Sequence, residues 1–325
     1  MKVYLNQKNR QIGPYSLDEA RELIYRGEVT RSALALSEGT TEWIPLEKLL
    51  SNNNPDKPPV AAPPQITIPL DRLRDPLEKT ALMWLFIASV PGWALLILWT
   101  VFTMGMAAVI LGVIALAILF GELWFGAYVK ANGICVSQSQ LPELHKVVES
   151  CCSRLQMPVP DVFILQQNVW NAFATKIVGR RMVVLLSGAV DSILLKGNMQ
   201  QLAWVIGHEL GHHYAGHLEF SRKLANVGGW CVWLKLWYSR RAELTCDRIG
   251  LYCAGSFKDS ELALMNATVG AQLASQVNVT EAINQWQQCR GEFFVRYRTF
   301  YSTHPHHLAR LEQLARASSE FGLSR

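Results

Sequence analysis

The sequence predicts a mainly α-helical protein of the α+β class, with a membrane hairpin between a small N-terminal domain and a larger C-terminal one. Residues 1–52 carry strand and helix signals, residues 80–128 are almost continuously apolar, and residues 131–325 mix helical periodicity with short strand-like runs. We therefore divide the chain into an N-terminal domain, a linker, a transmembrane hairpin and a C-terminal domain, at residues 1–52, 53–79, 80–130 and 131–325.

The composition of the 325-residue chain indicates a membrane partner. Half of the residues are hydrophobic, 18% are charged and the formal net charge is +5. Basic residues are scattered and not interleaved with aromatic ones, so we expect no nucleic-acid partner. The seven cysteines have irregular spacing without a CxxC pair, which favours buried thiols in a reducing compartment over a disulfide framework.

Residues 1–52 are expected to form a compact unit. Val3–Asn6 is typical of a strand and Gly13–Ser16 of a turn. Ser16 and Glu19 form a capping box at the start of a helix that should end at Gly27.

The same unit resembles the GYF-like domains that are fused to bacterial membrane proteins. The shared features are Tyr4, the Gly13-Pro14-Tyr15 turn, the helix end at Gly27, and Trp43 before Pro45. This resemblance implies binding of a peptide or a partner protein. Alternatively, Tyr15 and Trp43 are simply the core of a very small domain.

Two different segments follow. Ser51–Pro69 is rich in Asn and Pro and should be an extended, semi-rigid linker. Thr80–Tyr128 is too long for one membrane crossing and fits two crossings of about 20 residues each. We expect membrane helices at about residues 80–102 and 106–128, joined by a turn at Thr103–Met106.

Charges at the ends of the hairpin predict its orientation. Arg72, Arg74 and Lys79 precede the first apolar segment and Lys130 follows the second, whereas the turn is uncharged. The positive-inside rule then places the N- and C-termini in the cytoplasm, in a multi-pass protein of the cell inner membrane. Because the N-terminus lacks a signal-peptide core, we expect the first 52 residues to stay in the cytoplasm. Glu122 either reaches the membrane interface or is a functional carboxylate within the membrane.

The C-terminal domain should combine helices with three short strands. Apolar residues have helical spacing over residues 141–155, and the strand candidates are residues 161–165, 171–175 and 182–186. Further helices are expected over residues 199–217 and at about 240–254, 259–276, 280–298 and 306–318. The aromatic run Gly228–Tyr238 is too short to cross a bilayer, so it lies either at the membrane surface or in the core.

The clearest chemical signal is an HExxH motif within Val205–His217. His208 and His212 are four residues apart and share one face of a helix, with Glu209 beside the first. This spacing allows two imidazoles to bind one Zn²⁺ while the carboxylate faces the water on the metal.

The two other histidines of this segment do not complete the site. On an undistorted helix, His213 and His217 lie on other faces than the first pair. The extended motif HExxHxxGxxH also fails, because its Gly and His positions hold Ala215 and Leu218. We interpret His213 and His217 as flanking residues that touch substrate or lipid headgroups.

Ser239–Gly250 can supply the third ligand. On a helix, Glu243 and Asp247 share a face, so Glu243 can bind the metal while Asp247 orients a ligating imidazole. Two histidines and one glutamate leave a coordination position for water, as in catalytic zinc sites. We predict one Zn²⁺ per chain and Glu209 as the general base, with the ligands His208, His212 and Glu243.

These motifs resemble the HtpX-like and CAAX-prenyl-protease family of membrane zinc endopeptidases, which are gluzincins. The resemblance covers residues 131–325 and rests on HELGH (His208–His212), SRRAELTCD (Ser239–Asp247), VWNAFAT (Val169–Thr175) and STHP (Ser302–Pro305). The second motif matches the family pattern SRxxExxAD, with Cys246 in place of Ala. The resemblance implies a gluzincin-type domain with a small edge-stranded sheet.

The resemblance also implies roles for further residues. Substrate would lie in extended form along an edge strand at Asn171, Ala172, Phe173 and Ala174, in a β-augmentation. His304, with Asn171, would act near the substrate carbonyl, although His304 could instead cap a helix. Arg310 and Arg240 are expected in structural ion pairs.

As a whole, the sequence predicts a zinc metalloendopeptidase that cleaves misfolded, membrane-associated or regulatory proteins on the cytoplasmic side. The second hydrophobic pair of HtpX and the large chamber of prenyl proteases are missing, which favours a simple two-pass protease over CAAX processing. Two alternatives stay open. One is an adaptor that keeps a structural metal and binds peptide without cleaving it. The other is a zinc hydrolase of a small molecule, which needs a closed pocket beside Asn171–Ala174.

Overall fold

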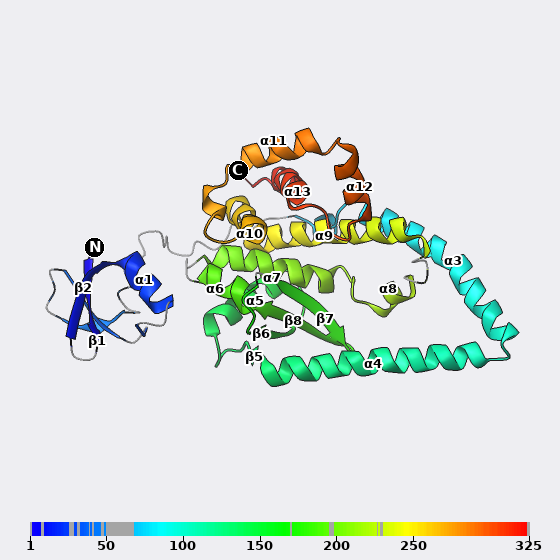
Figure 1. Ribbon diagram of the computed structural model, residues 1–325, viewed down its shortest axis with the longest axis horizontal. Helices are drawn as coiled ribbons and strands as arrows, with labels where there is room; N and C mark the ends of the chain where they lie inside the picture. The colour runs from blue at the N-terminus through cyan, green and yellow to red at the C-terminus, as the bar shows by residue number, and fades with distance from the viewer. Residues whose placement is uncertain are drawn as a thin grey trace. The chain divides into compact units, whose positions relative to one another are not determined.

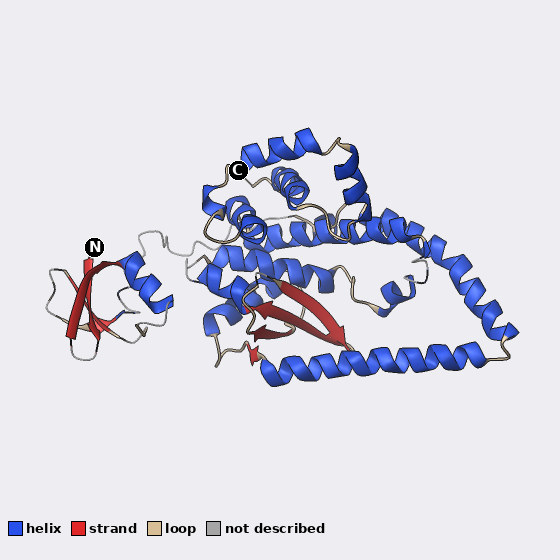
Figure 2. Cartoon of the chain, viewed as in Figure 1, coloured by secondary structure: helices blue, strands red, loops and turns tan. Residues whose placement is uncertain are grey.

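The chain was analysed as a computed structural model, shown in Figures 1 and 2. It describes residues 2–7, 10–25, 29–30, 33–38, 40, 42–46, 49, 68–169, 171–194, 198–225, 227 and 230–323. Gly27, Trp170 and most of the predicted linker lie outside this range. The chain forms two compact units, Met1–Ala62 and Pro63–Arg325, and each is described by itself.

The first unit is a four-stranded antiparallel sheet with one helix. The sheet has the order β2-β1-β3-β4, and the elements are β1 (Lys2–Gln7), β2 (Arg10–Ser16), α1 (Leu17–Tyr25), β3 (Leu34–Ser37) and β4 (Ile44–Pro45). The capping box is confirmed: the Ser16 amide donates to Glu19 Oε2 at 2.7 Å, and the Glu19 amide donates to Ser16 Oγ at 3.2 Å. Tyr15 packs against the buried core around Val3 and Leu5.

The second unit begins with a short 3-10 turn, η1 (Leu70–Leu73), and then the hairpin. Helices α3 (Glu78–Phe102) and α4 (Met106–Asn132) are both long and apolar enough to cross a membrane. They meet at a turn in which Gly105 has a φ of +87°, a left-handed conformation that suits glycine. Figure 1 shows this turn far from the second sheet.

A mixed four-stranded sheet follows the hairpin. Its order is β5-β6-β8-β7, with strands β5 (Ile134–Cys135), β6 (Asp161–Leu165), β7 (Ala172–Ile177) and β8 (Arg180–Leu186). Strand β6 pairs with β8 in parallel, and β7 pairs with β8 in antiparallel orientation. Within this sheet β7 is therefore an edge strand, as the family resemblance implied.

Helices make up the rest of the unit, as Figure 2 shows. They are α5 (Pro142–Arg154), α6 (Ser187–Leu194), α7 (Met199–Tyr214), α8 (Phe220–Ala225), α9 (Val232–Ala254), α10 (Phe257–Val269), η3 (Ala274–Gln276), α11 (Val279–Cys289), α12 (Phe293–Tyr301) and α13 (His307–Glu320). The predicted mainly α architecture with a hairpin and a small edge-stranded sheet is confirmed.

Four expected helix boundaries were wrong. The helix expected over residues 199–217 ends at Tyr214. The helix expected over residues 259–276 ends at Val269, where Gly270 has a φ of +84°. The helix expected over residues 280–298 is two helices, α11 and α12. Helix α9 begins at Val232, so the second half of the aromatic run is helical.

Candidate metal centre

Helices α7 and α9 bring the two sequence motifs together because glycines allow their backbones to approach closely. A Cβ at Gly207 would lie 2.6 Å from Cβ of Cys253, and one at Gly211 would lie 3.0 Å from Cα of Cys246. At Gly250 of α9, a Cβ would lie 2.8 Å from the Trp204 carbonyl oxygen. Any larger residue at these positions would push the two halves of the site apart.

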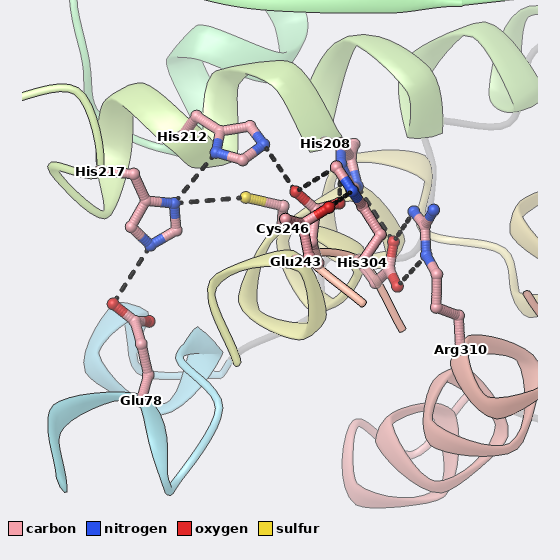
Figure 3. A network of polar contacts seen from close by, with 10 residues as sticks. Glu78, His208, His212, His217, Glu243, Cys246, His304 and Arg310 are labelled. Atoms are coloured by element: carbon pink, nitrogen blue, oxygen red, sulfur yellow. Dashed lines mark hydrogen bonds and ion pairs between the residues drawn. The ribbon is translucent and has the colours of Figure 1, made fainter. Parts of the chain in front are cut away.

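The three predicted ligands converge on one point between the helices, as Figure 3 shows. His208 Nε2 lies 3.5 Å from Glu243 Oε2, and His212 Nε2 lies 3.7 Å from Glu243 Oε1. Ligand atoms at about 2.0–2.1 Å from a tetrahedral Zn²⁺ would be about 3.3–3.4 Å from one another. The three side chains therefore fit one such ion with little movement.

A second set of donors must be weighed, because Cys246 also lies close. Single ligand atoms of His208, His212 and Cys246 fall within 4.8 Å of one another. Burial and nearby carboxylates raise the pKa of the Cys246 thiol well above its ordinary value, which disfavours the thiolate in the metal-free protein. Burial would also raise the pKa of Glu243, but hydrogen bonding and charge from His208 and His212 outweigh it and lower that pKa. Both Glu243 and Cys246 therefore lie where a third ligand is needed, and the carboxylate of Glu243 is favoured as an anion in the metal-free protein.

The surroundings of His208 and His212 shift the pKa values of the two imidazoles in opposite directions. Burial alone would lower the pKa of His208, but hydrogen bonds to Asp247 and Glu243 outweigh it and raise the pKa to about 10. Burial lowers the pKa of His212 to about 3. Contacts with Asp247 and Glu243 thus favour a proton on His208, which a metal ion bound there would displace.

Asp247 fixes the orientation of His208. Its Oδ1 lies 3.0 Å from His208 Nδ1, on the ring nitrogen that faces away from Glu243. Arg310 donates two hydrogen bonds to the same carboxylate, from Nε at 2.9 Å and from Nη2 at 2.6 Å. The expected ion pair of Arg310 is thus present. Its partner is the carboxylate that holds a candidate metal ligand.

Glu209 is buried beside the edge strand. Loss of solvent raises the pKa of Glu209 to about 7, and the positive charges of His208 and Arg310 and a backbone hydrogen bond from Ala174 offset this only in part. A carboxyl group with such a pKa can both accept and donate a proton near neutral pH.

A cleft of about 540 Å³ contains these groups. Its lining includes Asn171, just before β7, and Ala172–Ala174 of that strand, together with His208, Glu209, His212, Glu243 and His304. The His304 side chain is 64% exposed and its Nε2 lies 3.5 Å from Glu243 Oε1. His306, not His304, is the N-cap of α13, so the capping interpretation of His304 was wrong.

The ion pair that we expected for Arg240 is not observed among the described residues. Arg240 instead donates from Nη1 to the carbonyl oxygens of Phe300 and Ser302, at 3.1 and 2.7 Å. Ser302 Oγ in turn donates to the carbonyl oxygen of His304. Arg240 therefore holds the loop that brings His304 to the cleft.

The prediction for His213 and His217 was wrong, because neither is a freely exposed flanking residue. His213 is buried, with its Nε2 3.1 Å from the Met182 carbonyl oxygen. Helix α7 ends at Tyr214, and Gly216 with a φ of +74° turns the chain so that His217 reaches back to His212. The glycine at a helix C-terminus was the sequence signal that would have ended the helix before His217.

Two helix-borne imidazoles, a carboxylate from a second helix and a buried glutamate beside an edge strand define the class as a metallopeptidase. The model of peptidase family M48 matches residues 138–227 and 219–318, which together are more than half of the chain. The chain therefore belongs to peptidase family M48. The GYF domain 2 model matches residues 4–49, which confirms the GYF-like N-terminal domain.

Relatives by sequence are proteases as well. The plastoglobule-localized metallopeptidase 48 of Arabidopsis thaliana is 30% identical over 171 residues, which are 47% of this chain and 48% of that protein. The protease HtpX homologue of Pyrococcus furiosus is 26% identical over 258 residues, 65% of this chain and 86% of the relative. That of Salinibacter ruber is 38% identical over 94 residues, 29% of this chain and 33% of the relative. No solved structure matches the chain.

Proposed function

We propose that this chain is a membrane-anchored, zinc-dependent metalloendopeptidase that hydrolyses peptide bonds of protein substrates. One Zn²⁺ per chain would be held by His208, His212 and Glu243. The observation that carries the proposal is the convergence of these side chains, with Nε2-to-carboxylate distances of 3.5 and 3.7 Å, beside the buried Glu209.

Zn²⁺ in this position would supply Lewis acidity toward the scissile carbonyl and the attacking water. Glu209 would take a proton from that water and deliver it to the leaving amine, which suits a carboxyl whose pKa burial raises to about 7. Asp247 would hold the His208 ring through the 3.0 Å contact to Nδ1. His304 and Asn171 both line the cleft and would donate to the substrate carbonyl oxygen.

Substrate would bind to the edge of β7 as an added strand. Ala172–Ala174 line the cleft, β7 is the last strand of its sheet, and backbone pairing to such an edge accepts many side chains. This supports a protein or peptide substrate over a small molecule.

The segment between α7 and α9 supports a site at the membrane surface. Trp230 donates from Nε1 to the Ala88 carbonyl oxygen of α3, and Lys223 forms an ion pair with Glu122 of α4. From Ala88 to Phe102, helix α3 extends about 21 Å at 1.5 Å per residue. Because the hydrocarbon core is about 30 Å thick, Ala88 would lie within about 9 Å of its boundary on the side of the metal site, which supports a position of this segment near the lipid interface.

Side-chain exposure agrees with that position. Trp230 and Trp233 are 60% and 52% exposed, which favours the membrane-surface interpretation of the aromatic run over the core interpretation. Leu218, which lines the cleft, leads into the same segment. We therefore propose membrane-associated substrates, cleaved in quality control or regulation on the cytoplasmic face of the inner membrane, with both termini cytoplasmic. The GYF-like domain would recruit a substrate or partner protein.

The decisive experiment measures zinc content and proteolysis of an unfolded protein by the purified full-length chain in detergent. We expect one zinc per chain, and cleavage that Glu209→Gln abolishes while zinc is retained. A non-cleaving adaptor would keep zinc without any proteolysis. A Glu209→Gln variant that cleaves at the wild-type rate would refute the mechanism, and a reporter after Arg325 that faces away from the cytoplasm would refute the topology.

A further inference from the structure

We propose that Glu78, in the first turn of the membrane helix α3, positions the metal ligand His212 through His217. Because the metal site is itself proposed, this role depends on the function proposed above. His208 has an orienting carboxylate in direct contact, Asp247, whereas the corresponding nitrogen of His212 faces another histidine. The second ligand therefore reaches a carboxylate in two steps instead of one.

The contacts form a continuous chain, drawn in Figure 3. His212 Nδ1 lies 3.1 Å from His217 Nδ1, and His217 Nε2 lies 3.1 Å from Glu78 Oε1. The His217 and Glu78 side chains are 5% and 1% exposed, so water does not compete for these bonds. The His217 amide also donates to the His212 carbonyl oxygen at 3.0 Å, which fixes the two residues relative to each other.

One arrangement of protons satisfies every bond in this chain. A ligating His212 needs a free lone pair on Nε2, so its proton is on Nδ1 and is donated to Nδ1 of His217. His217 then carries its own proton on Nε2 and donates it to Glu78 Oε1, an ionised carboxylate that only accepts. Cys246 Sγ, at 3.7 Å from His217 Nδ1, is the more distant neighbour of that nitrogen.

Besides His217, two further side chains contact the Glu78 carboxylate. Thr245 Oγ1 donates to Oε2 at 2.6 Å, and Arg74 Nη1 donates to Oε1 at 3.1 Å. Arg74 Nη2 also donates to the carbonyl oxygen of Ala215, at the end of α7. A buried carboxylate with these partners is anchored to α9 and to the end of α7 at once.

The consequence is that the membrane hairpin contributes to the metal site. Partners that orient ligating histidines typically change metal affinity 10- to 100-fold when they are removed. Separation of α3 from α7 and α9 would break the bond between Glu78 and His217 and free the ring of His212. The hairpin is then part of the machinery that retains the metal as well as an anchor.

Two polar variants of His217 each keep one of the two bonds of this chain. In His217→Asn, the amide oxygen takes the place of Nδ1 and can still accept from His212, but no group replaces Nε2, so the bond to Glu78 is lost. In His217→Gln, the amide takes the place of Nε2, so the bond to Glu78 can form while the acceptor for His212 is lost. His213→Gln is the matched control, because His213 is also buried in α7 but bonds to the Met182 carbonyl oxygen.

The measurement is Zn²⁺ affinity of the full-length chain in detergent, by competition with a chelator. Because the proposed role needs both bonds, we expect His217→Gln and His217→Asn each to bind Zn²⁺ about 10- to 100-fold more weakly, and His213→Gln to stay within about threefold of wild type. Wild-type affinity in either folded variant of His217 would overturn the proposal. If His217→Gln does not fold, unchanged affinity in folded Glu78→Ala would overturn it instead. Failure of the wild type to bind Zn²⁺ would instead refute the proposed function.

Discussion

Replacing Glu209 by Gln is expected to stabilise the metal-free protein above pH 7 while it abolishes cleavage. Burial raises the pKa of the Glu209 carboxyl from 4.5 to about 7 in the folded state. The folded protein therefore favours the neutral acid, and the stability gained from it is complete below pH 4.5 and lost as the pH rises through 7. Gln is neutral at every pH, so the variant escapes this loss.

The size of this change in the free energy of unfolding follows from the two pKa values of Glu209, 4.5 in the unfolded state and about 7 in the folded state. One pKa unit corresponds to about 1.4 kcal/mol, so ionised Glu209 costs the folded state about 3 kcal/mol at pH 8 and less than about 0.5 kcal/mol at pH 4.5. For a protein of this size, about 3 kcal/mol raises the melting temperature by about 6–12 °C. Gln retains a carbonyl oxygen that can accept the Ala174 amide proton, so little else should change.

The assay is thermal unfolding of the chelator-treated protein in detergent at pH 8 and at pH 4.5. Glu143→Gln is the control, because that side chain is 68% exposed and is expected to change the melting temperature by less than about 2 °C at either pH. An equal gain for Glu209→Gln at both pH values would show that ionisation is not the cause. No gain at pH 8 would refute the buried-charge reasoning altogether.

Three further outcomes are expected. In chelator competition, Glu243→Gln should weaken Zn²⁺ binding at least about 100-fold and Cys246→Ala by less than about twofold. A larger loss of Zn²⁺ affinity in Cys246→Ala than in Glu243→Gln would make the thiol the ligand. Gly211→Ala places a Cβ 3.0 Å from Cα of Cys246, so the variant should be destabilised by about 1–3 kcal/mol and should cleave more slowly. An unchanged melting temperature would contradict the tight packing of α7 on α9. Deletion of residues 1–52 should change substrate choice or partners in pull-down and cleavage assays but spare peptide hydrolysis, and lost hydrolysis would contradict a recruiting role.

Much of the site could be predicted because its signals are local. The spacing of His208 and His212 on a helix, the shared face of Glu243 and Asp247, and the strand candidate before α7 each depend on a few neighbouring residues. Backbone periodicity translates such spacings directly into faces and edges. The apolar length of residues 80–128 likewise determined the hairpin, because a bilayer has a fixed thickness.

The rest was decided by contacts between distant parts of the chain. Glu78 and His217 are 139 positions apart, and no periodicity links a residue at the start of a membrane helix to one beyond the end of α7. The role of Arg240 was likewise set by the carbonyl groups of Phe300 and Ser302, which only the folded chain brings near. The sequence by itself therefore determined which side chains could bind a metal. The tertiary structure decided which partners hold them in place, because orientation depends on packing between α3, α7 and α9 and not on spacing within any one of them.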